Sequence, residues 1–176
     1  MTDLAIGAAR VEEAEQILKL QRLCYRPEAA LYDDWTIPPL TQTLWELLEQ
    51  YEDHTVLVAR LEGEVVGSVR ARLEAGTCHV GRLVVHPRLQ RRGLGTRLMR
   101  EIEASFPEAE RYELFTGHLS DGNLRLYRSL GYKEVREEEV SPALRLVYLR
   151  KERGTARRST RKVVLRAIRP IVRSPR

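Results

Sequence analysis

The fold of this chain is decided by the stretch Leu83-Val84-Val85-His86-Pro87-Arg88-Leu89-Gln90-Arg91-Arg92-Gly93-Leu94-Gly95-Thr96-Arg97-Leu98. It reads as the end of a strand, a short loop, a glycine-containing turn and the start of a helix. The first turn of a helix offers backbone N–H groups without partners and the positive end of the helix dipole. Glycines let a phosphate approach the backbone closely, and two arginines add positive charge. The stretch therefore predicts a cradle for a phosphate or pyrophosphate.

Two better-known phosphate-binding motifs do not fit this stretch. A nucleotide P-loop needs a Lys-Ser or Lys-Thr pair after its last glycine, whereas Gly95 is followed by Thr96-Arg97. A dinucleotide-binding fingerprint needs a third glycine at the position that Leu98 occupies. The strand before the turn also belongs to a run of antiparallel strands, which is not the context of either motif.

The flanking sequence predicts an α/β (α+β) domain. Apolar alternation predicts strands at 4–8, 54–61, 65–73, 77–85, 111–116, 133–140 and 144–149. Helical spacing predicts helices at 11–24, 43–51, 95–106 and 121–130, whereas the prolines and aspartates of 25–40 predict an irregular loop. We expect one domain over 1–150, with a mixed, mostly antiparallel central sheet of about six to seven strands flanked by helices.

The charge of the chain is unevenly distributed. Residues 151–176 contain ten Lys or Arg and one Glu, a net charge of +9 out of a total of +5, which leaves residues 1–150 at −4. Apolar and basic residues alternate in a helical pattern between 161 and 173, and Pro170 interrupts that pattern. We expect a basic amphipathic tail at 151–176. It would be a solubilising segment, a helix that docks on the body or on a second subunit of a homodimer, or a weak contact to nucleic acid or an anionic membrane.

The remaining composition favours a soluble protein of the cytoplasm. No apolar run approaches the length of a membrane span, and the first residues do not resemble a signal peptide. The two cysteines, Cys24 and Cys78, lie in no metal-binding pattern, which fits a reducing compartment.

Two motifs in the predicted order resemble the GNAT superfamily of N-acetyltransferases. Gln90, Gly93 and Gly95 match the family's Gln/Arg-x-x-Gly-x-Gly/Ala pattern, which binds pyrophosphate. Downstream, the segment from Asn123 through Tyr127 to Gly131-Tyr132 matches the pattern Asn-x-x-x-Tyr-x-x-x-Gly-Phe/Tyr. The resemblance covers roughly residues 4–150 and implies the acyl-CoA N-acyltransferase fold, with acetyl-CoA as the co-substrate.

The resemblance also implies roles for individual residues. The strand residues Leu83, Val84 and Val85 would offer backbone groups to pantetheine, and an amide near Val84 or Val85 would polarise the thioester carbonyl. The turn residues would hold the pyrophosphate, and they are Gln90, Arg91, Arg92, Gly93, Leu94, Gly95 and Thr96. Asn123 would contact the CoA arm, and Tyr127 would protonate the leaving thiolate or donate a hydrogen bond to the sulfur.

The acceptor and its general base remain open at this stage. A small-molecule or peptide amine must attack in its neutral form, yet 77–85 contains no carboxylate that would act as the base. His79, Asp33, Asp34 and Glu74 are candidates, as are a water chain or no dedicated base. Tyr25, Tyr32 and Trp35 would line an acceptor pocket or pack their segment onto the body. The alternative function is a non-catalytic sensor that binds acyl-CoA.

Overall fold

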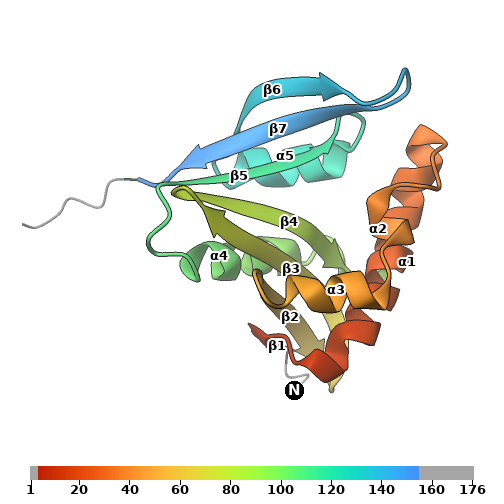
Figure 1. Ribbon diagram of the computed structural model, residues 1–176, viewed down its shortest axis with the longest axis vertical. Coiled ribbons are helices and arrows are strands. Elements are labelled where there is room, and N and C mark those ends of the chain that lie inside the picture. Colours follow the sequence, from red (N-terminus) through yellow and green to blue (C-terminus); the bar gives the residue numbers. More distant parts are fainter. Residues whose placement is uncertain (1–3, 155–176) are drawn as a thin grey trace, which may run out of the picture.

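The computed structural model describes residues 4–154 of the 176-residue chain, so the predicted basic pattern at 161–173 lies outside the described residues. One seven-stranded sheet has the order β1-β2-β3-β4-β5-β7-β6 (Figure 1). All neighbouring strands are antiparallel except β4 and β5, which confirms the predicted mixed sheet. The strands are β1 (Leu4–Ala8), β2 (Thr55–Leu61), β3 (Glu64–Glu74), β4 (Thr77–Val85), β5 (Arg111–Gly117), β6 (Lys133–Glu139) and β7 (Arg145–Glu152).

Helices cover both faces of the sheet (Figure 1). The first face carries α1 (Ala14–Tyr32), α2 (Pro38–Thr41) and α3 (Leu44–Gln50), and the opposite face carries α4 (Leu94–Ala104) and α5 (Asp121–Ser129). Two short 3-10 turns, η1 (Val11–Glu13) and η2 (Pro87–Leu89), precede α1 and follow β4. The apolar stripes of these helices fill two cores, because a sheet and a helix each bury one side against the other.

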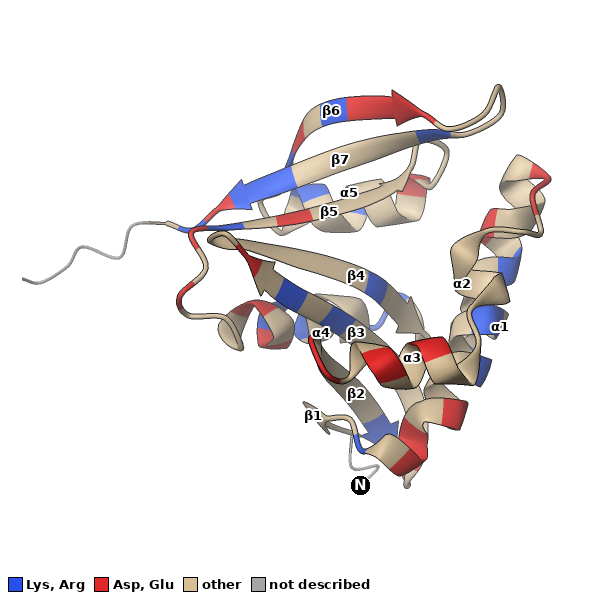
Figure 2. Cartoon of the chain, in the orientation of Figure 1, with Lys and Arg blue, Asp and Glu red and all other residues tan. Residues whose placement is uncertain are grey.

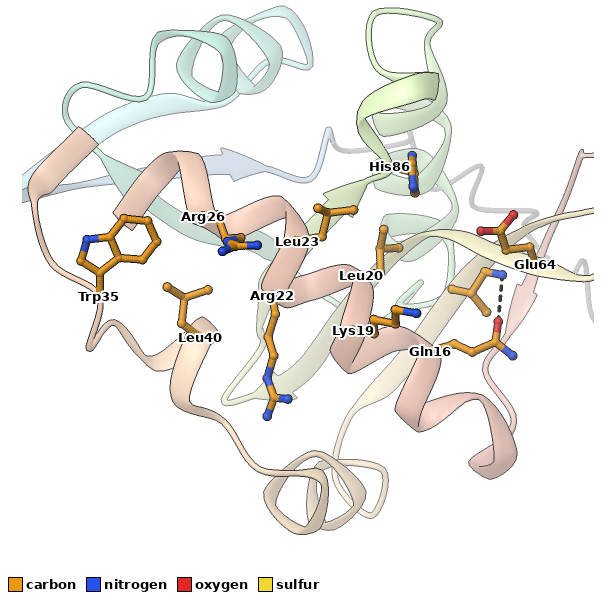
Figure 3. A pocket seen from close by; sticks show the side chains of 11 residues that line it. Gln16, Lys19, Leu20, Arg22, Leu23, Arg26, Trp35, Leu40, Glu64 and His86 are labelled. Carbon is orange, nitrogen blue, oxygen red and sulfur yellow. Dashed lines mark hydrogen bonds between the residues drawn. The ribbon is translucent and has the colours of Figure 1, made fainter. Parts of the chain in front are cut away.

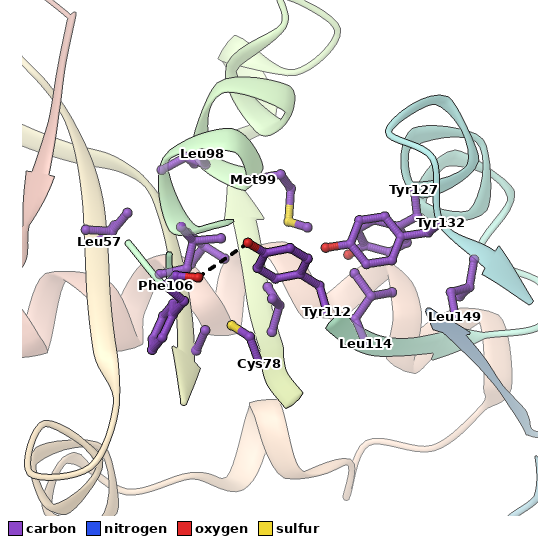
Figure 4. Packing of buried hydrophobic residues seen from close by; sticks show 14 of the residues in the cluster. Leu57, Cys78, Leu98, Met99, Phe106, Tyr112, Leu114, Tyr127, Tyr132 and Leu149 are labelled. Carbon is purple, nitrogen blue, oxygen red and sulfur yellow. Dashed lines mark hydrogen bonds between the residues drawn. The ribbon is translucent and has the colours of Figure 1, made fainter. Parts of the chain in front are cut away.

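The larger core lies between the sheet and α4 with α5. Figure 4 shows Leu98 and Met99 of α4, Tyr112 and Leu114 of β5 and Leu149 of β7 packed in this cluster. The smaller core joins α1 and α3 to β2, β3 and the end of β4. Each of the predicted amphipathic helices therefore has a defined partner surface.

The segment 25–40 was predicted to be an irregular loop, and that prediction was wrong. The first helix continues through Pro27 to Tyr32, and a further short helix begins at Pro38. Pro27 removes one backbone donor from the helix. That loss is offset because Ala29 and Tyr32, one turn later, are 0% and 6% exposed. Pro38 and Pro39 stand in the first turn of α2, where a missing N–H costs nothing.

The parallel strands β4 and β5 pair over only three positions. The paired residues are Thr77–His79 and Arg111–Glu113, although both strands continue well beyond them. A β-bulge contributes to this divergence. The register of β3 and β4 shifts between Ser68 and Arg70, and Arg82 on β4 takes a left-handed φ of 53°. The two strands therefore separate toward their C-terminal ends and leave a wedge-shaped gap.

Two classes of feature are absent from residues 4–154. No helix there is long and apolar enough to cross a membrane. No group of three or more His, Cys, Asp or Glu in that range is arranged to hold a metal ion.

Candidate functional site

The edge of β4 that faces the gap carries backbone groups without a strand partner. The His86 N–H donates to the Val66 carbonyl of β3 at 2.8 Å. Backbone groups alternate in direction along a strand, so the N–H and carbonyl of Val85 face away from β3 and toward the gap. Val84 pairs with Ser68 and faces β3, and the bulge at Arg82 interrupts the alternation before Leu83. The structure thus distinguishes Val85 from Val84, which the sequence did not.

The Val85 carbonyl already has partners. The Cys24 thiol on α1 donates to it at 3.3 Å, and the Gln90 amide donates to it at 3.0 Å. Burial raises the pKa of Cys24 to about 11, so the thiol stays protonated and remains a donor at neutral pH. The side chain of Gln90 therefore ties the turn back onto β4, while the Val85 N–H remains directed at the gap.

The turn after β4 presents a series of free backbone donors. Among residues 4–154, no backbone carbonyl accepts a hydrogen bond from any N–H between Arg91 and Thr96. Arg91 and Gly93 both take left-handed φ values, 59° and 78°, which curve these amides around the start of α4. Leu94 is 3% exposed and anchors the helix start in the core. The predicted cradle is therefore built from main-chain donors.

The two glycines of the cradle have different surroundings. A Cβ placed on Gly93 would have no heavy atom within 4 Å, so the space in front of it is open. A Cβ placed on Gly95 would lie 3.4 Å from Leu126 Cδ2 of α5. Gly93 thus supplies the φ value and the open approach, whereas a side chain at Gly95 would make an ordinary contact with Leu126.

Helix α5 carries Asn123 and Tyr127, which are four residues apart and share one helical face. The Asn123 amide donates to Thr116 Oγ1 of β5 at 3.2 Å. The Tyr127 side chain is 7% exposed, and burial, followed by the nearby Tyr25 and Glu28, raises its pKa. The neighbouring Tyr132 differs, since its hydroxyl donates to Glu103 Oε1 at 2.8 Å.

The Tyr127 hydroxyl makes no hydrogen bond to any residue that the structure describes. Among those residues, Arg111 Nε is the single fully buried side-chain nitrogen or oxygen atom without a partner. The Tyr127 oxygen is therefore accessible, although most of the ring is covered. A protonated hydroxyl with a free donor is suited to bind an electron-rich atom in the gap.

Sequence reasoning missed a polar cluster at the open end of the gap. Glu28 of α1 accepts a hydrogen bond from Ser120 Oγ at 2.6 Å, and Ser120 is 5% exposed. Tyr32 accepts from the Leu119 N–H at 2.9 Å and packs against Gly117, the last residue of β5. Glu28 went unrecognised because its partner Ser120 lies 92 positions later, and no local pattern connects the two residues. It is the carboxylate that contributes to the raised pKa of Tyr127.

The general-base candidates named from the sequence lie elsewhere. His79 belongs to the paired, closed end of the gap, and Glu74 forms an ion pair with Arg72 at the far end of β3. Asp33 caps the end of α1, and Asp34 accepts from the backbone and hydroxyl of Thr36. The aromatic residues of this region differ in exposure, since Tyr32 is buried against the body and Trp35 is 53% exposed.

Two hollows lie outside the cradle. The α1 hollow, of about 640 Å³, is seen in Figure 3 and is lined by Gln16, Lys19, Leu20, Arg22, Leu23, Arg26, Trp35, Leu40, Glu64, Val65 and His86. The α3 hollow, of about 460 Å³, is lined by Pro38, Thr41, Gln42, Glu46, Glu49, Gln50, Asp53 and Arg82. Neither hollow contains a residue of the turn from Arg91 to Thr96, so both are separate from the free amides.

Comparisons with known proteins agree with this geometry. The chain matches the model of the Acetyltransferase (GNAT) family over residues 14–132. An N-alpha-acetyltransferase from Sulfurisphaera tokodaii is 30% identical over 146 residues, which cover 74% of this chain and 81% of that protein.

Solved structures share the fold. The PaiA N-acetyltransferase from Thermoplasma acidophilum, solved in complex with coenzyme A, superposes with a TM-score of 0.71 at 17% identity, covering 86% of this chain and 99% of that one. The ribosomal-protein-alanine N-acetyltransferase from Brucella melitensis gives a TM-score of 0.66 at 19% identity, covering 84% and 99%.

Proposed function

The chain belongs to the GNAT acetyltransferase family and is an acetyltransferase whose co-substrate is acetyl-CoA; we propose that its acceptor is the α-amine at the N-terminus of a peptide or protein. The amine attacks directly, with donor and acceptor bound together. The choice of acceptor is supported by the relative from Sulfurisphaera tokodaii, which is described as an N-alpha-acetyltransferase. Direct attack is supported by the separation of β4 from β5 beyond His79 and Glu113, with α1 on one face of the sheet and α4 and α5 on the other.

The observation that carries this proposal is the continuity of the gap with the free amides of the turn. The backbone N–H groups from Arg91 to Thr96 fit a pyrophosphate, because the site is a helix start with open space over Gly93. Leu83 and Val85 offer strand-edge groups to the pantetheine arm. Acetyl-CoA would supply a thioester when bound, and the Val85 N–H, which faces away from β3, would donate a hydrogen bond to its carbonyl oxygen.

Two side chains handle protons in this proposal. Glu28 takes the proton from the attacking amine, directly or through a water, because it is the carboxylate at the open end of the gap. Tyr127 donates a hydrogen bond to the departing sulfur, and its raised pKa keeps it protonated for that purpose. Asn123, fixed to Thr116, lies one helical turn before Tyr127 and would contact the arm of the donor.

The domain boundary also belongs to this proposal. The body predicted over 1–150 carries the transferase site, and β7 runs on to Glu152. The body therefore extends at least to Glu152, two residues into the segment 151–176 that the sequence assigns to a basic tail.

Calorimetry of coenzyme A binding tests the donor site. Gly93→Asp puts a side chain and a negative charge into the open space of the cradle. Gly63→Asp is the matched control, since Gly63 also has a positive φ of 81° and open space but lies in the β2–β3 turn. We expect micromolar binding by the native protein and by the control, with binding lost in Gly93→Asp. Equal binding by both variants would place the pyrophosphate elsewhere.

An acetylation assay tests the acceptor. The native protein, acetyl-CoA and unblocked peptides should release free thiol and give peptides acetylated at the α-amine by mass spectrometry. Glu28→Gln should lower kcat by about 10²-fold, whereas Glu15→Gln, an exposed carboxylate on the same helix, should not change it. Binding of acetyl-CoA with no transfer to any amine would favour the acyl-CoA sensor instead.

A further inference from the structure

Two arginines lie next to each other on the face of the sheet that α1, α2 and α3 cover. Arg70 of β3 pairs in register with Gly81 of β4, and Arg82 is the next residue along β4. Figure 2 shows basic positions on these two strands behind the acidic positions of α3. Like charges on adjacent strands repel each other, so this placement lowers stability unless something compensates it.

Arg70 is buried without a carboxylate partner. It is 4% exposed, and its Nη2 donates to Gln42 Oε1 at 2.9 Å and to Gln21 Oε1 at 3.3 Å. Among residues 4–154 it forms no ion pair. Burial, and then the charge of Arg82, lowers the pKa of Arg70 to about 10. An unpaired buried cation is costly, which marks this position as one that an anion would stabilise.

Arg82 links this pair of charges to the reaction gap. Its guanidinium lies 5.9 Å from the ring centre of Tyr25, and it has no ion-pair partner in the described part of the chain. Tyr25 in turn lies near Glu28 and Tyr127, since Glu28 affects the pKa of Tyr25 and both residues raise that of Tyr127. The left-handed φ of Arg82 is unfavourable for a side chain with a Cβ, and such strain concentrates at functional sites.

The α3 hollow gives a ligand access to Arg82. Its three carboxylates are held by other groups: Glu46 by Thr43, Glu49 by Trp45 and Asp53 by His54. Gln42, which also lines the hollow, connects it to Arg70. Arg82 thus has carboxylates within its hollow and forms an ion pair with none of them; its guanidinium lies beside Tyr25 instead.

We infer that Arg82, supported by Arg70, binds a carboxylate side chain of the acceptor, so that the preferred substrate is a peptide with an Asp or Glu near its N-terminal amine. This inference rests on the proposed function and specifies the substrate class of the same site. A guanidinium binds a carboxylate through two parallel N–H···O bonds, which gives direction as well as charge. The amine then lies at Glu28, and the acidic side chain reaches back over Tyr25 to the arginines.

Peptide pairs test this inference. Neutral peptides amidated at the C-terminus receive Glu, Gln or Lys in turn at each of the first four positions, so that the side chain is the sole carboxylate. At one position we expect the Glu peptide to exceed the Gln peptide by about tenfold in kcat/KM, mainly through KM, and the Lys peptide to be poorest. Added salt should reduce the advantage. Equal rates for all three peptides at all positions would overturn the inference and leave the proposed function intact.

Variants locate the effect. Arg82→Gln should bring the ratio of the Glu to the Gln peptide to about one, and Arg82→Glu should favour the Lys peptide. Arg72→Gln, which removes a surface arginine paired with Glu74 on the same strand as Arg70, is the control and should keep the native ratio. Circular dichroism establishes that each variant is folded. A native ratio in folded Arg82→Gln would exclude Arg82 as the binding residue, and no transfer to any peptide would instead overturn the proposed function.

Discussion

Two tyrosines in one core cluster should respond in opposite ways to removal of their hydroxyls. Tyr127 and Tyr132 are both buried, with ring centres 6.1 Å apart in the same cluster. Tyr127 has no hydrogen-bond partner among the described residues, whereas Tyr132 donates to Glu103. Tyr127→Phe should therefore impair the reaction and leave the fold intact, and Tyr132→Phe should do the reverse.

The size of each effect follows from these contacts. A hydrogen bond to a charged group contributes about 1.5–3 kcal/mol. Glu103 keeps its ion pair with Lys151 at 2.7 Å, so Tyr132→Phe should lose about 1–2 kcal/mol of unfolding free energy, or roughly 3–6 °C of Tm. Tyr127→Phe removes no bond and should change stability by less than about 0.5 kcal/mol. Its kcat should fall by about 10²-fold, with KM nearly unchanged, because positioned proton donors contribute on that scale.

Thermal unfolding and steady-state acetyl transfer, measured on the same two preparations, separate the two roles. The reasoning would be refuted if Tyr127→Phe kept its native kcat, because the accessible hydroxyl would then have no part in the reaction. It would equally be refuted if Tyr132→Phe lost kcat while keeping the native Tm. A fall in both quantities for both variants would mean that the cluster acts as one packing unit.

Three further changes test the scaffold around the site. Glu13 is 3% exposed and lies 2.6 Å from Arg60, whose hydrogen bond lowers the pKa of Glu13 to about 2. The ion pair therefore stabilises the fold fully at a pH above the ordinary pKa of a glutamate, and this stabilisation is lost as the pH falls toward 2. Glu13→Gln should cost about 2 kcal/mol in urea unfolding at neutral pH and much less near pH 2, and an equal cost at both would contradict the ion pair. Gly117→Ala would place a Cβ 2.1 Å from the Tyr32 hydroxyl, so transfer activity should fall by at least about tenfold; unchanged activity in a folded variant would show that this contact does not shape the site. Thr43→Ala removes the cap of α3 and should cost about 1 kcal/mol without altering KM for acetyl-CoA, as denaturation and kinetics together would show.

Local sequence patterns were sufficient for the sheet and for the turn that precedes α4. Alternating strands and helical stripes are short-range signals, and the glycine turn before α4 carries its geometry in consecutive residues. The extent of α1 was not accessible in this way. Pro27 is normally evidence for a helix boundary, and only the burial of Ala29 and Tyr32 against the body explains why the helix continues.

The acceptor side of the site was missed for a related reason. Glu28 and Ser120 are 92 positions apart and meet because α1 crosses the ends of β5 and α5. No spacing rule connects residues so distant in sequence, so no local signal separated Glu28 from the other carboxylates of its segment. No sequence signal marked Arg82 as a candidate site residue either, because its bulge conformation and its position beside Arg70 result from strand pairing.

The free amides between Arg91 and Thr96 have a consequence for how this turn can change over generations. In the proposed role, the turn binds pyrophosphate through the orientation of its backbone N–H groups. Most side chains of the turn can therefore change in evolution while the function persists. Most alanine substitutions would leave the affinity of such a site nearly unchanged, because alanine retains the backbone N–H. Substitutions that alter conformation, such as proline at a donor position or a branched residue at Gly93, would expose it. Side-chain substitutions in this turn that leave activity unchanged are therefore no evidence against its role in binding.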